Sequence, residues 1–248
     1  MNAALDWDYS ALAEHYRHRA PYADAALSQL FAMLALQEGA SAIDVGAGTG
    51  RFTAALVAQG FAVTAVEPNT AMRAIGRRAV PDACWLDARG EATGLDGARH
   101  DLVSFGSSFN VLPASAALAE AARLLRPGGW LVCLWNHRDL DDALQRELQT
   151  ILEREVPGYA HGTRREDPTA AILADGRFDA AHRIEGRLRH AIETHDFVEG
   201  FRAHATLIRQ AGPKLPRVLD ALAQRLAGSA RLSVPFVTRV FAAQRTLT

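Results

Sequence analysis

Short apolar runs alternate with segments of helical periodicity through the middle of the chain. The apolar runs predict strands at 42–46, 61–66, 83–86, 101–106 and 129–135, and the helical segments cover 51–59, 69–78 and 114–125. Turn residues mark the boundaries, with Pro68 after the second run, Pro113 at a helix start and Pro127-Gly128-Gly129 before the fifth run. Strands separated by helices of this length indicate a parallel sheet with right-handed crossovers.

The segments on either side of this core are also patterned. Residues 9–36 have helical spacing that is interrupted at Pro21, which predicts two helices that meet near this proline. Beyond residue 139, helices are predicted at 140–156, 196–210 and 215–227, and strands at 183–192 and 233–243. The chain is thus predicted to form an α/β fold, in which a doubly wound, mostly parallel seven-stranded sheet carries helical cap segments.

The length of 248 residues and the hydrophobic content of 49% fit one elaborated domain over residues 1–248. Within it we expect N-terminal helices at 1–40, a ligand-binding core at 41–139, and cap segments at 140–180 and 195–230. The net charge of -1 gives no general electrostatic reason to bind nucleic acid or an anionic membrane. No apolar stretch reaches about 18 residues, and the first ten residues lack a secretory pattern. We therefore expect a soluble, cytoplasmic protein. We also expect it to be a monomer or a homodimer. Cys84 and Cys133 lie in apolar runs that predict buried strands, so no disulfide framework is expected.

A glycine-rich turn follows the first predicted strand, with Gly46, Gly48 and Gly50 in alternate positions. Glycine allows positive φ and lets a ligand lie against the main chain, and the first strand-to-helix turn of an open parallel sheet is a usual ligand site. The dinucleotide fingerprint would require a glycine at position 51, where this chain has Arg51. The spacing therefore favours a nucleoside with an amino-acid arm over a pyrophosphate.

Glu67 ends the second predicted strand. A carboxylate at this place can accept hydrogen bonds from both hydroxyls of a ribose. The alternative is a surface glutamate that caps the next helix. Because Glu67 follows the glycine turn in the expected order, we predict a nucleoside site.

Several segments together resemble motifs of the class I S-adenosylmethionine-dependent methyltransferases. They are Ile43–Gly50 with Glu67, the loop around Gly90-Glu91, the stretch Phe105–Asn110 and the turn Leu124–Gly129. Two further stretches, Leu134–Asp139 and Val234–Val240, resemble the small-molecule branch related to trans-aconitate methyltransferases. The resemblance implies a Rossmann-like sheet with an antiparallel last strand, S-adenosylmethionine as cofactor and S-adenosylhomocysteine as product.

The resemblance also implies roles for the cofactor-binding residues. Asp44 would position the methionine amine, Gly46, Gly48 and Gly50 would line the cofactor, Glu67 would hold the ribose, and Gly90 and Glu91 would frame the adenine. Many relatives have Asp where Arg89 aligns, with the side chain toward the adenine amine, and this chain departs from them there.

An N-terminal segment with Tyr16, Arg19 and Tyr22 is similar to the family's Tyr-x-x-Arg-x-x-Tyr segment, which folds over the methionyl end of the cofactor. Arg19 would pair there with the cofactor carboxylate. Helix packing explains Tyr16 and Tyr22 equally well.

A sulfonium methyl group is already activated, so its transfer depends mainly on holding the acceptor in line and excluding water. A protein base is needed for a hydroxyl or a protonated amine and is dispensable for a carboxylate. His137, after the fifth strand, is the first candidate for this base, and the alternative is a solvated residue at a strand end. Asn110 and Ser107 are expected to face the acceptor, unless they only close a turn.

Two further groups of residues are candidates for binding. Arg164 and Arg165, together with Tyr159, could hold a substrate carboxylate, or could belong to an exposed loop. The aspartates at 139, 141 and 142 could suggest a magnesium site, but capping of helix 140–156 explains them more directly. With no zinc-type spacing of Cys and His, we predict no metal.

The sequence therefore predicts an enzyme that methylates a small-molecule carboxylate, hydroxyl or amine, a reaction of the kind used in secondary metabolism. A nucleic-acid methyltransferase is disfavoured because Asn110-Val111-Leu112-Pro113 lacks the Pro-Pro-aromatic run of enzymes that methylate exocyclic amines. The remaining alternatives are an NAD-dependent oxidoreductase, which Arg51 disfavours, and a non-catalytic, cofactor-binding regulatory protein.

Overall fold

The computed structural model describes residues 8–247, apart from the side chain of Arg164. The strands are β1 (Ser41–Val45), β2 (Ala62–Val66), β3 (Cys84–Leu86), β4 (His100–Gly106), β5 (Leu125–Arg138), β6 (His182–Glu193) and β7 (Arg231–Gln244). They form one sheet in the order β3-β2-β1-β4-β5-β7-β6. In this sheet β7 runs antiparallel to both of its neighbours. The predicted fold class is confirmed, including the antiparallel last strand.

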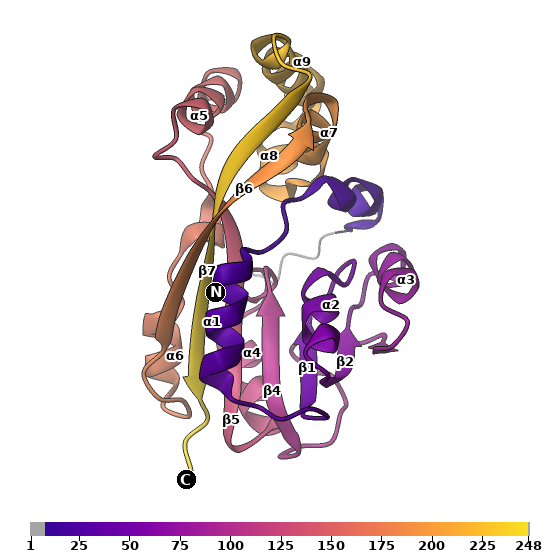
Figure 1. Ribbon diagram of the computed structural model, residues 1–248, viewed down its shortest axis with the longest axis vertical. Coiled ribbons are helices and arrows are strands. Elements are labelled where there is room, and N and C mark those ends of the chain that lie inside the picture. The colour runs from indigo at the N-terminus through magenta and orange to yellow at the C-terminus, as the bar shows by residue number, and fades with distance from the viewer. Residues whose placement is uncertain (1–7, 248) are drawn as a thin grey trace.

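Helices cover both faces of the sheet (Figure 1). Side chains of α1 (Asp24–Leu34) and α2 (Arg51–Ala58) share one buried cluster with one face of the strands. Side chains of α4 (Ala114–Leu124) and α6 (Thr169–Asp175) share a second cluster with the other face. The central strands are therefore buried on both sides, which explains why they appear in the sequence as continuous apolar runs.

A third group of helices packs around the carboxyl end of β6 and the amino end of β7. This group lies above the carboxyl ends of the parallel strands (Figure 1). It comprises α5 (Ala143–Glu155), α7 (Thr194–Glu199), α8 (Ala205–Ala211) and α9 (Leu215–Leu226). Leu148, Phe197 and Leu222 are buried there against Leu232 and Val234 of β7. These helices form the cap, and no helix in the described residues is both long and apolar enough to cross a membrane.

The N-terminal segment runs between the core and the cap (Figure 1). Its first turn is a 3₁₀-helix, η1 (Ser10–His18), and the chain then continues past Pro21 into α1. His15 and His18 of η1 lie 3.5 Å from the carboxylates of Glu199 and Asp196 in the cap. The two helices predicted on either side of Pro21 are present, and the first one bridges the two halves of the molecule.

Two local predictions were wrong. The single helix expected at 196–210 is divided into α7, the 3₁₀-turn η4 (Gly200–Ala203) and α8, because the backbone of His204, with φ of -89° and ψ of 85°, leaves the helical conformation. Cys84 is exposed, because β3 is an edge strand, whereas Cys133 in the middle of the sheet is buried as expected. Neither difference affects the order of the central strands.

Candidate cofactor and substrate cavities

A cavity of about 410 Å³ lies at the carboxyl ends of β1, β2 and β4. β1 is flanked by β2 on one side and β4 on the other, so this is the point at which the strand order reverses. Ligands of open α/β sheets bind at such points. Residues of η1 and α8 close the cavity from the cap side.

The glycine turn forms one wall of this cavity. Gly46, Gly48 and Gly50 all have positive φ, at 65°, 59° and 85°. An added Cβ at Gly46 would lie 2.5 Å from the Cβ of Ser108, whereas at Gly48 it would meet no atom within 4 Å. Gly46 is thus required by packing, and Gly48 leaves its main chain open to a ligand.

Glu67 is buried directly after β2, and its carboxylate accepts hydrogen bonds from two main-chain N–H groups. Its Oε2 accepts a hydrogen bond from the N–H of Gly48, and its Oε1 accepts one from the N–H of Asn69, each at 2.8 Å. Burial raises the pKa of the Glu67 carboxyl group. The cap of the next helix is Asn69, whose side chain accepts from Met72 N. Each carboxylate oxygen of Glu67 has a further lone pair with which it can bind a diol.

Asp44 is fully buried in β1 and also lines the cavity. Its carboxylate accepts hydrogen bonds from Thr53 Oγ1 at 2.7 Å and from Ser104 Oγ at 3.0 Å. Burial nevertheless raises the pKa of Asp44 to about 6. A cation placed in the cavity would stabilise the ionised form.

Gly90 and Glu91 line the opposite end of the cavity. An added Cβ at Gly90 would lie 2.6 Å from Val45 Cγ1 and 2.9 Å from Leu112 Cδ1, so only glycine packs here. Glu91 Oε1 accepts a hydrogen bond from Arg89 Nε at 2.8 Å. Glu91 Oε2 is buried without a hydrogen-bond partner among the described residues. Such an orphaned acceptor fits a ligand that brings an N–H group.

The N-terminal segment supplies Tyr16, Arg19 and Tyr22 to the same cavity. The guanidinium of Arg19 lies over the Tyr16 ring, 5.1 Å from its centroid. Arg51 Nη2 donates a hydrogen bond to the carbonyl oxygen of Tyr16 at 3.1 Å, which ties η1 to the start of α2. Tyr22 packs edge-on against Phe52, with the ring centroids 5.8 Å apart. The segment therefore both closes the cavity and packs against the core.

Ser107 and Asn110 follow β4 and lie in the wall of this cavity, and their expected place facing the acceptor stays a prediction. Ser107 has a positive φ of 64°, and its N–H donates to Leu134 O at 2.8 Å. Asn110 Oδ1 accepts a hydrogen bond from the indole of Trp135 at 2.9 Å. The Asn110 amide is thereby fixed by β5.

His137 and Tyr159 line a second, smaller cavity of about 100 Å³ under the cap. The two cavities share Arg19 and Thr206, so they adjoin. The structure therefore separates the predicted site residues into two groups, one in each cavity. Arg164 belongs to the 3₁₀-turn η3 (Gly162–Arg165), and its side chain lies outside the described part of the structure.

Arg165, a candidate from the sequence for holding a substrate carboxylate, lines the smaller cavity together with Arg138, to which sequence reasoning gave no role. Arg138 ends β5 and was quoted above only as part of a resembling stretch. The available signal was its position directly after His137, at the carboxyl edge of the sheet. Nothing in the spacing indicated that its side chain is buried.

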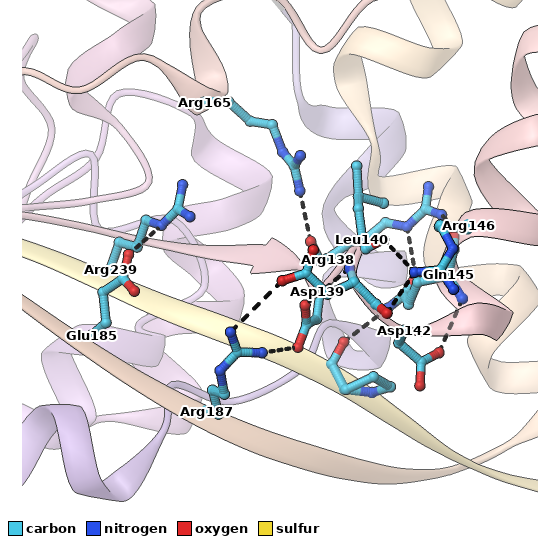
Figure 2. Close-up of polar contacts among 12 residues, drawn as sticks. Arg138, Asp139, Leu140, Asp142, Gln145, Arg146, Arg165, Glu185, Arg187 and Arg239 are labelled. Atoms are coloured by element: carbon cyan, nitrogen blue, oxygen red, sulfur yellow. Dashed lines mark hydrogen bonds and ion pairs between the residues drawn. The ribbon is translucent and has the colours of Figure 1, made fainter.

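The aspartates after β5 have structural partners (Figure 2). Asp142 caps α5, because its Oδ1 accepts a hydrogen bond from Gln145 N at 3.1 Å. Asp139 forms an ion pair with Arg187 of β6. Within residues 8–247 no group of His, Cys, Asp or Glu is arranged to hold a metal ion.

Comparison with known proteins agrees with this geometry. Residues 43–133 match a protein family described as a methyltransferase domain. An uncharacterized methyltransferase of Mycobacterium tuberculosis is 35% identical over 146 residues, which cover 59% of this chain and 58% of that protein. A demethylmenaquinone methyltransferase of Beutenbergia cavernae is 40% identical over 103 residues, which cover 40% of this chain and 42% of that protein.

Among solved structures, a putative type II methyltransferase from Anaeromyxobacter dehalogenans aligns with a TM-score of 0.58 and 19% identity, covering 92% of this chain and 98% of that chain. This likeness supports the Rossmann-like fold. The core at residues 43–133 is similar to a methyltransferase domain, and this similarity supports the predicted enzyme class. The alignment spans 58% of the length of the mycobacterial relative. The resemblance to the trans-aconitate branch stays a prediction.

Proposed function

We propose that the protein transfers the methyl group of S-adenosylmethionine to a small-molecule acceptor. The observation that carries this proposal is the cavity at the strand-order reversal, in which Asp44, Gly48 and Glu67 lie together within the segment that matches a methyltransferase domain. Its volume of about 410 Å³ suits a nucleoside with an amino-acid arm.

Each part of the cofactor has a partner in this cavity. Glu67 would accept hydrogen bonds from the ribose, and Glu91 Oε2, which lacks a partner in the described structure, would accept one from the adenine amine. Asp44 would hold the methionine ammonium group, and Arg19 its carboxylate. The main chain at Gly48 leaves room for the ligand between these groups.

The acceptor would occupy the smaller cavity and reach the cofactor past Arg19 and Thr206, which border both cavities. Bound S-adenosylmethionine supplies an electrophilic methyl group, and the protein's task is to align the acceptor and exclude water. We assign to His137, in the wall of the smaller cavity, the removal of a proton from a hydroxyl or amine acceptor. A cytoplasmic location, a monomeric or homodimeric state and a role in secondary metabolism are further predictions.

Titration calorimetry with S-adenosylmethionine, S-adenosylhomocysteine and NAD tests the cofactor assignment. We expect the first two to bind and NAD not to bind. Gly48→Ala should weaken the binding of S-adenosylmethionine, because the new Cβ would enter the cavity. Gly39→Ala is the matched control, since Gly39 has φ of 81°, open space at its Cβ position and no part in the cavity wall. Both substitutions carry a similar backbone strain, of about 1 kcal/mol.

Two results would contradict the proposal. Binding of NAD without binding of S-adenosylmethionine would indicate an oxidoreductase. Binding of S-adenosylmethionine without transfer of labelled methyl to any compound of a broad metabolite panel would indicate a non-catalytic binding protein. Equal loss of affinity in Gly48→Ala and Gly39→Ala would remove the glycine turn from the site.

A further inference from the structure

The smaller cavity has an unusual charge composition. Its wall contains the arginines Arg19, Arg138 and Arg165. It also contains the histidines His18, His137, His161, His190 and His204. Within the described structure no aspartate or glutamate lines it. A ligand in this cavity is therefore surrounded by cationic and neutral hydrogen-bond donors.

Arg138 is a buried cation whose hydrogen-bond partners are all neutral. It is 9% exposed, and its Nε and Nη2 donate to the side-chain and main-chain oxygens of Gln145 at 2.7 and 2.6 Å. Its Nη1 donates to Gln149 Oε1 at 3.3 Å. No carboxylate among the described residues forms an ion pair with it, and burial lowers the pKa of Arg138 to about 10. Three of the roughly five N–H groups of a guanidinium are thus used.

Arg165 also lines this cavity and contacts the main chain of Arg138. Its Nη2 donates to the carbonyl oxygen of Arg138 at 2.6 Å (Figure 2). Asp139, the first residue after β5, is paired with Arg187 instead (Figure 2). In the described part of the chain Arg165, too, forms no ion pair, and burial lowers its pKa. Both guanidinium groups therefore lack a carboxylate ion-pair partner among the described residues.

A buried charge is costly unless an opposite charge and hydrogen bonds compensate it. The missing partner of Arg138 and Arg165 is an anion, and the planar guanidinium group matches the oxygens of a carboxylate or phosphate. The cavity volume of about 100 Å³ suits one acid group on a small molecule. Its border with the cofactor cavity at Arg19 and Thr206 makes it accessible to a methyl acceptor.

We infer that the acceptor is a small organic anion, whose carboxylate or phosphate group binds Arg138 and Arg165 in the cavity under the cap. This identification of the ligand as the methyl acceptor rests on the proposed function. The binding of an anion at these two arginines does not depend on it.

Calorimetric titration tests the anion site, with malonate, its neutral analogue malonamide, and inorganic phosphate as probes. The wild-type protein should bind malonate or phosphate, and the stronger of the two identifies the oxyanion that the cavity prefers. Malonamide should not bind. Arg165→Gln should weaken anion binding about 10- to 100-fold, the value of one or two charge-assisted hydrogen bonds.

The matched control is Arg183→Gln, which removes the same charge from an exposed position of β6 outside both cavities. It should retain wild-type affinity for the anion. Arg138→Lys serves as a second variant, because lysine keeps the charge but cannot bind an oxyanion with two parallel hydrogen bonds. It should also weaken binding, and the cofactor affinity of each variant reports whether its fold is intact.

Equal binding of malonate and malonamide, or equal anion affinities in Arg165→Gln and Arg183→Gln, would overturn the inference. Its failure is distinguishable from failure of the proposed function. A protein that binds malonate through Arg165 but does not bind S-adenosylmethionine refutes the function and keeps the anion site. A protein that methylates only neutral compounds keeps the function and refutes the anionic acceptor.

Discussion

Replacement of Asp44 by asparagine should stabilise the protein at neutral pH while it removes the carboxylate that we propose as the partner of the cofactor's ammonium group. Asp44 is fully buried, and its pKa is raised from 3.8 to about 6 in the folded state. At about 1.4 kcal/mol per pKa unit, this difference means that ionised Asp44 lowers the free energy of unfolding by about 3 kcal/mol. Asparagine has the same shape and stays neutral, so the variant escapes this cost.

The direction of the pH dependence follows from the raised pKa. Both folded and unfolded states are protonated at this group well below pH 3.8, so its cost is absent there. The cost grows as the pH rises and is complete above pH 6. The advantage of Asp44→Asn over wild type should therefore increase by about 1.4 kcal/mol between about pH 5 and about pH 8. The changed hydrogen bonds to Thr53 and Ser104 add an offset that does not depend on pH.

Urea unfolding of both proteins without ligand, at the two pH values, measures this difference. Thr53→Ala is a control of opposite sign, because it removes a hydroxyl that stabilises the ionised carboxylate. That variant should lose more stability, relative to wild type, at the higher pH. An advantage of Asp44→Asn that is the same at both pH values, or smaller at the higher one, would refute the reasoning.

Local patterns were enough to predict the sheet and to bring together the residues of the larger cavity. Strand and helix periods are properties of neighbouring residues, so β1 to β4 appeared within one or two residues of their observed bounds. Gly48 and Glu67 were identified because each directly follows a strand, and the carboxyl ends of neighbouring parallel strands lie at one edge of a sheet. The order of strands along the chain was therefore enough to predict that Gly48 and Glu67 lie close together.

The smaller cavity could not be predicted in this way. Arg165 of η3 contacts Arg138 at the end of β5 because the two elements lie side by side in the fold. Asp139 is not available as a partner for them because it forms an ion pair with Arg187. The break at His204 likewise has no proline or glycine at that position to mark it in the sequence. Periodicity carries no information about such long-range contacts, and a buried guanidinium group looks like any other arginine in the sequence.

Two further substitutions test the walls of the cofactor cavity. Gly90→Ala would place a methyl group 2.6 Å from Val45 Cγ1. It should therefore lower the free energy of unfolding by about 1–3 kcal/mol in urea titrations. An unchanged value would mean that the side chain of Val45 can move away at little cost. Glu67→Ala should weaken the binding of S-adenosylmethionine by about 1–3 kcal/mol in calorimetry, the value of the hydrogen bonds that a carboxylate makes to a diol. Because Glu67 also holds the N–H of Gly48, part of this loss would come from the glycine turn, and Gly48→Ala in the same titration reports how much. Unchanged affinity in Glu67→Ala would remove Glu67 from the site.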